Sequence, residues 1–572
     1  MRFGLESGMR SDKNTQEISV LSRSPAMSRP RTQGGLWSAG AVMIAALVLA
    51  PILAVVVMAF DPRENIWPHL VATTLPRYLS NTAFLALGVG VFSAASGAGA
   101  AWLVVMYRFV GRGALEWLLL FPLAIPAYVG AYALSDFLDY SGPVQTALRA
   151  TFGWASARDY WFPSIRSREA AVVVLSAALY PYTYLITRAA LREQSGASYE
   201  VARALGAGPL ALFWRVGLPL ARPAIAAGAA IAMMETVADY GVVEHFGVQT
   251  LTTGIFATWL EGGNAGGAAQ LALLILGIVF LLFALEKVSR RKARYYQSAR
   301  HSRPVMPVTL TGWAGWLAAA LCALPVAFGF VLPVGVMASH ALANPEAWFG
   351  RGLGLALWHT LSTGGAAALL TVAMALFMVY GVRMTGAGLA RRLLPLTTLG
   401  YAAPGAVLAV GVLIPLAYFD NALADAVLAL TGHDPGLLLT GTAVAIVLAY
   451  VVRFFAIAQG AVDAAFARVP PSLPMAARSL GRAKGNVLRE IYVPLMRGSI
   501  GSALLLVFVD CVKELPATLL LRPFNYETLA TRVQEKASLE KLGEASPAAL
   551  LVSAVGLAAV LVLARANLGK RP

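Results

Sequence analysis

Four carboxylates lie within two long apolar segments of the chain, where an ionised side chain is costly. Glu235 and Asp239 are four residues apart in the first segment. Asp510 and Glu514 are four residues apart in the second. This spacing places both members of a pair on one face of a helix. Charged groups inside an apolar span are candidates for function, and hard multivalent cations prefer carboxylate oxygen. The four side chains are therefore predicted to line a cation pathway.

The alternative interpretation of these carboxylates is structural. Lys513 is adjacent to Glu514, so the acids can be neutralised by salt bridges or lie at the membrane surface. Tyr240, Glu244 and His245 could add oxygen or nitrogen ligands, although a histidine near the end of a span is more often interfacial. The residue types leave the identity of any bound metal open.

The segments that carry these residues belong to a strongly apolar chain. Of its 572 residues, 58% are hydrophobic and 13% are charged, against about 25% charged in a typical soluble domain. Several apolar runs reach the roughly 20 residues that a helix needs to cross a bilayer. None shows the alternation of about ten residues that is typical of a membrane-spanning barrel. The sequence therefore predicts an all-α polytopic membrane protein.

About twelve transmembrane helices are predicted, six in each half of the chain. Those of the first half are expected at residues 37–60, 81–106, 114–139, 170–190, 219–244 and 268–287. Those of the second half are expected at residues 312–338, 356–382, 392–418, 438–460, 494–520 and 547–565.

The net charge of +16 comes from Lys and Arg in short segments between the apolar runs. This distribution indicates membrane topology rather than nucleic-acid binding, because cytoplasmic loops are enriched in basic residues. The connection after the sixth span is the most basic, with Lys287, Arg290, Arg291, Lys292, Arg294, Arg300 and Arg303. Segments 245–267 and 419–437 hold no Lys or Arg. Both termini are therefore expected to be cytoplasmic, and segment 140–169 is expected outside although it contains Arg149, Arg158, Arg166 and Arg168.

The two halves are related by an internal repeat. Thr82 and Thr360 occupy equivalent positions of the two halves, and so do Pro126 and Pro404. Both halves begin on the same side, so the repeat is parallel, unlike the inverted repeats of many secondary transporters. The predicted organisation comprises a disordered cytoplasmic tail (1–35), a first six-helix half (36–290), a basic cytoplasmic linker (291–310), a second six-helix half (311–566) and a cytoplasmic tail (567–572).

Two cytoplasmic loops, one in each half, repeat a single pattern. Segment 199–219 reads YEVARALGAGPLALFWRVGLP, and segment 474–494 reads PMAARSLGRAKGNVLREIYVP. In each loop a short helix ends in a glycine, and a proline that begins a span follows the glycine at the same spacing. Glycine permits a sharp turn, and proline is tolerated at a helix start. The two loops are therefore predicted to project small helices into the cytoplasm.

These loops resemble the signature of the membrane subunits of ATP-binding-cassette (ABC) importers: EAA, three residues, Gly, nine residues, then an aliphatic residue and Leu-Pro. The matching positions are Glu200, Ala202, Gly206, Leu218 and Pro219 in the first loop and Ala476, Ala477, Gly481, Val493 and Pro494 in the second. Val201 replaces an alanine, and Met475 replaces the glutamate. The resemblance implies that each short helix docks in a groove of a cytoplasmic ATPase and transmits its opening and closing. Because Met475 lacks the carboxylate, the two loops are not expected to make equal contacts.

The resemblance also implies the partners of the chain. No Gly-x-x-x-x-Gly-Lys-Ser/Thr phosphate loop occurs in the sequence, so ATP hydrolysis is expected on a separate subunit and not on this chain. The expected partners are two copies of a cytoplasmic ABC ATPase, which hold ATP and Mg, a periplasmic substrate-binding protein and the lipid bilayer. No cofactor is expected on this chain itself, and the expected location is the bacterial inner membrane.

Two further segments bear on the substrate. Residues 234–259 and 510–533 are similar to the corresponding segments of single-chain ferric-iron permeases. This similarity implies import of ferric iron from the periplasm to the cytoplasm by alternating access. Permeases for thiamine, phosphonate or polyamine share the architecture and remain alternatives. A secondary transporter driven by an ion gradient is the alternative of a different class, and the duplicated loops argue against it.

Overall fold

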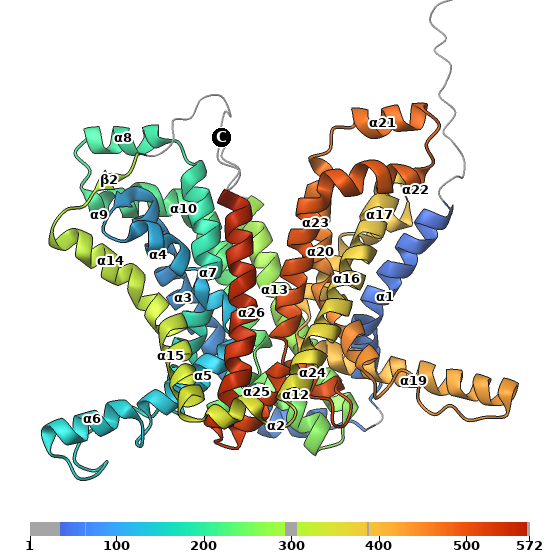
Figure 1. Ribbon diagram of the computed structural model, residues 1–572, viewed down its shortest axis with the longest axis horizontal. Coiled ribbons are helices and arrows are strands. Elements are labelled where there is room, and N and C mark those ends of the chain that lie inside the picture. Colours follow the sequence, from blue (N-terminus) through green and yellow to red (C-terminus); the bar gives the residue numbers. More distant parts are fainter. Residues whose placement is uncertain (1–34, 63, 292–305, 386–387, 569–572) are drawn as a thin grey trace, which may run out of the picture.

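The computed structural model describes residues 35–62, 64–291, 306–385 and 388–568 (Figure 1). Residues 1–34 of the predicted N-terminal tail and 569–572 of the C-terminal tail lie outside the described residues. So does most of the predicted linker, 292–305, with four of its basic residues: Lys292, Arg294, Arg300 and Arg303.

The described chain is built almost entirely of helices, as predicted. Eleven of its helical segments are long and apolar enough to cross a membrane, and a bent pair of helices brings the number to as many as twelve. The long helices of the spans in the first half are α1 (Gly35–Phe60), α3 (Leu75–Met106), α7 (Arg168–Glu193), α10 (Leu218–Ala238) and α13 (Ala265–Arg291). In the second half they are α16 (Leu353–Thr385), α19 (Gly405–Thr431), α20 (Ala443–Ala467), α23 (Val493–Val512) and α26 (Leu542–Leu568). A further span joins α14 (Trp313–Val326) to α15 (Leu332–Ala343) through the π-helical turn η4 (Ala327–Val331).

The span predicted over 114–139 is present as a bent pair of helices and not as one unbroken helix. The structure has α4 (Arg112–Leu118), the 3₁₀ turn η1 (Phe121–Ala124) and α5 (Ala127–Leu138), with a bend of 97° at the break. Pro126 explains the break, because proline lacks an N–H and keeps the preceding residue, Ile125, in an extended conformation.

The span predicted over 392–418 is also interrupted, and its long helix begins later than predicted. Short helices α17 (Leu389–Leu393), η6 (Leu396–Thr398) and α18 (Leu399–Ala402) come first, and α19 begins only after Pro404.

The predicted helices over 219–244 and 494–520 are also interrupted. The first consists of α10, which ends at Ala238, and α11 (Gly241–His245). The second consists of α23, which ends at Val512, and α24 (Pro516–Leu521). Each predicted carboxylate pair is therefore split by a break, and the expectation that both members share one helix face is wrong.

The internal repeat is visible in matched hydrogen bonds. The Thr82 hydroxyl accepts a hydrogen bond from the Leu251 amide at 3.1 Å, and the Thr360 hydroxyl accepts one from the Leu529 amide at 2.8 Å. These contacts hold the first residues of α12 (Leu251–Phe256) and α25 (Leu529–Ser538) against α3 and α16. Both short helices begin with a threonine capping box, which indicates that the two halves fold alike at this point.

Removal of these hydroxyls should destabilise the chain. In Thr82→Val or Thr360→Val a buried amide loses its acceptor, so we expect a loss of about 1–3 kcal/mol for each substitution. The measurement is thermal unfolding in detergent. Thr73→Val, which alters an exposed hydroxyl, is the control. Equal unfolding temperatures in all three variants would show that the threonine contacts do not stabilise the fold.

The two halves are interlocked through their first helices. Helix α1 packs against α16 and α19 of the second half, and α15 packs against α5 of the first. Trp37 of α1 stacks on Phe377 of α16 with their ring centroids 4.6 Å apart. A parallel two-stranded pairing of β1 (Tyr107–Arg108) with β2 (Val308–Thr309) adds a second link. Residues of both halves therefore occur in each of the three hydrophobic clusters of the described chain.

The short elements define two faces of the molecule (Figure 1). One face carries the two repeated loops, 199–219 and 474–494, and is called the coupling-loop face. Its short helices are α8 (Gly196–Ala204), α9 (Pro209–Leu212), α21 (Ser472–Ser479) and α22 (Lys484–Val487). Helix α1 begins and α26 ends on this face. The opposite face carries α2 (Trp67–Thr73), α6 (Pro143–Phe152), α12 and α25. The 3₁₀ turn η5 (Pro345–Phe349) follows α15 in the chain, and the π-helical turn η3 (Ala257–Glu261) follows α12.

Segment 140–169, the exception to the charge pattern, contains α6 and lies on the opposite face (Figure 1). Three of its four basic residues, Arg149, Arg166 and Arg168, have charged or aromatic partners. The Arg149 guanidinium lies 4.0 Å from the centre of the Tyr140 ring, and Arg166 pairs with Glu540 at 3.3 Å. These contacts give the three basic residues a structural role.

Candidate functional site

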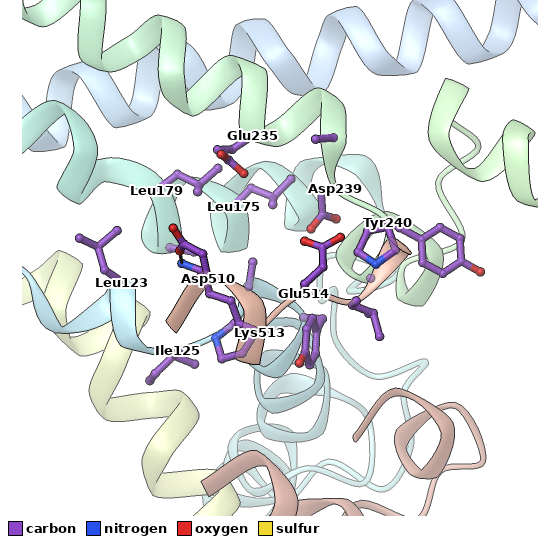
Figure 2. A pocket seen from close by; sticks show the side chains of 18 of the residues that line it. Leu123, Ile125, Leu175, Leu179, Glu235, Asp239, Tyr240, Asp510, Lys513 and Glu514 are labelled. Atoms are coloured by element: carbon purple, nitrogen blue, oxygen red, sulfur yellow. Dashed lines mark ion pairs between the residues drawn. The ribbon is translucent and has the colours of Figure 1, made fainter. Parts of the chain in front are cut away.

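A cavity of about 130 Å³ lies where the broken helices of the two halves meet. All four predicted carboxylates line it: Glu235, Asp239, Asp510 and Glu514 (Figure 2). Arg453 and Lys513 line the same cavity. The structure thus brings together four acids that come from opposite halves of the sequence, and it adds two basic side chains to them.

In the first half, the break after α10 orients one of the acids. Asp239 follows the last residue of α10, and its carboxylate accepts hydrogen bonds from the amides of Val242 at 2.9 Å and Val243 at 3.4 Å. The side chain therefore caps the start of α11, a position that suits a carboxylate. The side chain of the next residue, Tyr240, stacks on Phe256, with the ring centroids 3.7 Å apart.

In the second half, each acid has a basic partner. The Lys513 ammonium lies 2.8 Å from Asp510 Oδ1, and Arg453 Nε lies 3.3 Å from Glu514 Oε2. The Glu514 carboxylate also accepts a hydrogen bond from the Ala517 amide at 3.2 Å, at the start of α24. Asp510 and Glu514 are therefore both salt-bridged, as the alternative interpretation of the carboxylates predicted. Sequence adjacency suggested the wrong partner, because Lys513 pairs with Asp510 and not with Glu514.

Arg453 is the site residue that sequence reasoning missed. It lies in the middle of α20, and an arginine within so apolar a helix was a signal that could have found it. Gly405, at the start of α19, makes room for the pair. A methyl group at this position would overlap both the Glu514 carboxylate and the Arg453 guanidinium.

The other suggested ligands are arranged differently. Tyr240 lines the cavity, whereas Glu244 and His245 do not. His245 Nε2 is hydrogen-bonded to the Ser135 hydroxyl at 2.8 Å. Among the described residues, no three His, Cys, Asp or Glu side chains lie close enough together to hold a metal ion. The acids therefore line a cavity and do not form a preformed chelating site.

The two loops predicted to bind an ATPase have matching backbone turns. Gly206 follows α8 with φ of +82°, and Gly481 follows α21 with φ of +79°. These left-handed conformations favour glycine, because a side chain there is strained. No atom of the described residues lies within 4 Å of a Cβ added at either position, so the requirement is conformational and not steric. The predicted sharp turns are confirmed.

Each turn presents an apolar side chain to solvent. Leu205 and Leu480 directly precede the two glycines, and each is 83% exposed. Glu200 on α8 and Met475 on α21 are exposed at equivalent positions of the two loops, while the alanines at 202 and 477 are largely covered. Matched exposed leucines on one face are typical of a surface that binds a partner.

Aromatic residues anchor the two loops to the spanning helices. Trp102 of α3 lies 5.9 Å from Tyr199 of α8, centroid to centroid. Tyr199 donates a hydrogen bond to Gln194, and burial raises the pKa of this tyrosine to about 12, so that it remains a neutral donor. In the second half, the Tyr380 hydroxyl of α16 donates to the Lys484 carbonyl at 2.6 Å. Trp102 and Tyr380 occupy equivalent positions of the repeat and play equivalent roles.

The proline at the end of each loop lies at the start of an α-helix. The helical conformation itself begins several residues earlier, so the helix and the turn before it form one continuous helical rod. Leu218 and Pro219 start α10, and Val493 and Pro494 start α23, as predicted. Each is preceded without a gap by a π-helical turn: η2 (Phe213–Gly217) or η7 (Leu488–Tyr492). The wider turn accommodates the missing proline N–H. The second helical stretch of each loop is therefore continuous with the span.

A polytopic helical fold with two such loops on one face resembles the membrane subunits of ABC importers. The family model described as "binding-protein-dependent transport system inner membrane component" matches residues 86–295, which confirms the resemblance drawn from the loops.

Several curated proteins are similar to this chain. The Fe(3+)-transport system permease protein FbpB 2 of Haemophilus influenzae is 25% identical over 83% of this chain and 87% of its own length. The ferric transport system permease protein FbpB of Actinobacillus pleuropneumoniae is 24% identical over 84% of this chain and 70% of its own length. The sulfate transport system permease protein CysT of Salmonella typhimurium is 26% identical over 28% of this chain and 55% of its own length.

Proposed function

We propose that this chain is the membrane-spanning permease of an ATP-driven, binding-protein-dependent importer, and that its substrate is ferric iron. The observation that carries the proposal is the pair of equivalent loops, in which exposed Leu205 and Leu480 lie beside left-handed glycines on one face of the molecule. Two copies of a cytoplasmic ATPase dock on these loops and supply ATP and Mg. The chain itself binds no cofactor and hydrolyses no nucleotide.

The proposed orientation follows from the docking. The coupling-loop face is cytoplasmic, together with both termini, and the chain spans the bacterial inner membrane. A periplasmic binding protein delivers the substrate to the opposite face. Closure of the ATPase pair moves the loops, and the continuous helical rods that follow them carry this movement to the cavity. Substrate access then alternates between the two faces, as a population shift driven by ATP.

Two observations support ferric iron as the cargo. Of the relatives described above, the two that match more than four fifths of the chain carry ferric or Fe(3+) transport in their names. The cavity has four carboxylates against two basic side chains, so its formal charge favours a cation. An anion would be repelled there, whether sulfate, which the name of the relative CysT carries, or a phosphonate. Thiamine and polyamines are cationic and are separated from iron by experiment.

The test is transport in proteoliposomes that contain this chain, its ATPase and a binding protein loaded with radioactive ferric iron. We expect iron to accumulate in the compartment that the coupling loops face, and only when ATP is present in that compartment. Equal stimulation of ATP hydrolysis by a thiamine-loaded or polyamine-loaded binding protein, without iron uptake, would overturn the assignment of the cargo. Uptake driven by an ion gradient without ATP would identify a secondary transporter.

Glu235→Gln should lower the initial rate of iron uptake. Glutamine removes one of the four negative charges of the cavity while keeping the size of the side chain. We expect a decrease of about tenfold, which corresponds to about 1.4 kcal/mol. Glu346→Gln changes an exposed carboxylate outside the cavity and is the matched control. Equal uptake by the two variants would show that Glu235 is not part of the pathway.

A further inference from the structure

The two ion pairs that line the cavity differ in how exposed their side chains are. The side chains of Lys513 and Asp510 are 28% and 23% exposed, whereas those of Arg453 and Glu514 are 12% and 5% exposed. Burial and the tight fit against Gly405 hold the second pair in place. The first pair can be separated by a competing cation that enters the cavity.

The repeat shows that both basic residues are peculiar to the second half. When the two halves are aligned on the glycines of their coupling loops, Ala238 occupies the position of Lys513. In the same alignment Ala178 occupies the position of Arg453. Both alanines line the same cavity. The acids are thus duplicated in the two halves, and the lysine and the arginine are not. A lysine in only one half places a single tethered cation in a lining that is otherwise repeated.

A further group faces the same cavity. Tyr128 is 4% exposed and lines the cavity, and its hydroxyl has no hydrogen-bond partner among the described residues. Tyr182 lines the cavity as well. A buried hydroxyl without a partner is costly, and an incoming hard cation would give it one.

We infer that Lys513 selects the cargo by its charge, because the cargo must displace the Lys513 ammonium from Asp510. This inference rests on the proposed function. The attraction of a cation to a carboxylate grows in proportion to its charge, so a multivalent ion displaces the ammonium more readily than a monovalent ion does. Sodium, potassium and monovalent organic cations are therefore excluded. When Lys513 returns to Asp510 it expels the cargo, which keeps binding weak enough for release.

The experiment is a titration of the purified chain in detergent with terbium(III) alone, a hard trivalent cation whose luminescence is sensitised by nearby tyrosines. Lys513→Ala frees Asp510, so its terbium affinity should rise about tenfold, as expected for loss of a half-buried competitor. Lys513→Gln, which removes the charge but keeps a polar side chain only one atom shorter, should behave in the same way. Adding Asp510→Asn to Lys513→Ala should remove the gain.

The repeat provides a variant with the opposite sign. Ala238→Lys installs a second tethered cation at the equivalent position of the first half, and the terbium affinity should fall about tenfold. Potassium should compete with terbium in Lys513→Ala and not in the unaltered chain. A structural role of Lys513 alone would predict neither the gain in affinity nor the new sensitivity to potassium.

The outcomes separate the inference from the proposed function. Terbium binding by the unaltered chain that is unchanged or weakened in both Lys513 variants would overturn the inference and leave the cation pathway standing. Absence of terbium binding in the unaltered chain and in every variant would overturn both.

Discussion

Replacement of both Gly206 and Gly481 by valine should abolish ATP-driven uptake while the chain still folds and inserts into the membrane. At φ near +80° a valine is strained, so each turn is expected to relax at a cost of about 1–2 kcal/mol per site. No described atom lies near the added side chains, which removes a clash as the cause. The relaxed turns redirect Leu205 and Leu480, and the ATPase loses its contact surface. The measurements are uptake and ATP hydrolysis in proteoliposomes.

Gly208 is the matched control for this prediction. It lies in the first loop, has an extended backbone with φ of −69° and has no described atom within 4 Å of an added Cβ. Gly208→Val should therefore retain uptake. Normal uptake in the Gly206→Val/Gly481→Val double variant would show that the loops do not transmit ATP hydrolysis to the spans.

Arg453→Met should destabilise the chain by about 3–5 kcal/mol, the range observed when one member of a buried ion pair is removed. Glu514 is 5% exposed, so its carboxylate would remain buried without its counter-charge. Methionine keeps most of the apolar length of the arginine, which limits the effect of a cavity. The measurement is the unfolding temperature of the purified chain in detergent.

Two comparisons test the cause of this loss. Arg383→Met removes the basic member of an exposed pair, in which the Arg383 and Asp463 side chains are 40% and 55% exposed, and should cost about 1 kcal/mol or less. The double variant Arg453→Met/Glu514→Gln should recover much of the lost stability, because no buried charge is left alone. If Arg453→Met is no less stable than Arg383→Met, Glu514 does not depend on Arg453.

The fold class, the repeat and the coupling loops could be predicted from the sequence, because each depends on local properties. The length of an apolar run determines whether a helix can cross a bilayer. The glycines at 206 and 481 and the prolines at 219 and 494 act through their own backbone conformations. Duplication in one chain then supplies a second copy of each signal, and agreement between the copies made the loops recognisable.

Helix continuity was predicted less well. Prolines at 122, 126, 404 and 516 lie inside apolar runs whose hydropathy alone indicates unbroken spans. Whether such a proline only bends a helix or ends it depends on what satisfies the freed backbone groups. At Pro516 the Glu514 carboxylate accepts a hydrogen bond from the Ala517 amide, and at the proline-free break after α10 Asp239 accepts one from Val242. Both contacts became apparent only in three dimensions.

The sequence by itself determined that four carboxylates lie in two repeated apolar spans. Only the tertiary structure decided that they surround one cavity, and that Lys513 pairs with Asp510 and Arg453 with Glu514. The physical reason is that a salt bridge forms between groups that the fold brings within a few ångströms, whatever their separation along the chain. Lys513 and Glu514 are adjacent in the sequence, which suggested that they pair. They follow the end of α23, where the helix breaks, and their side chains contact different partners.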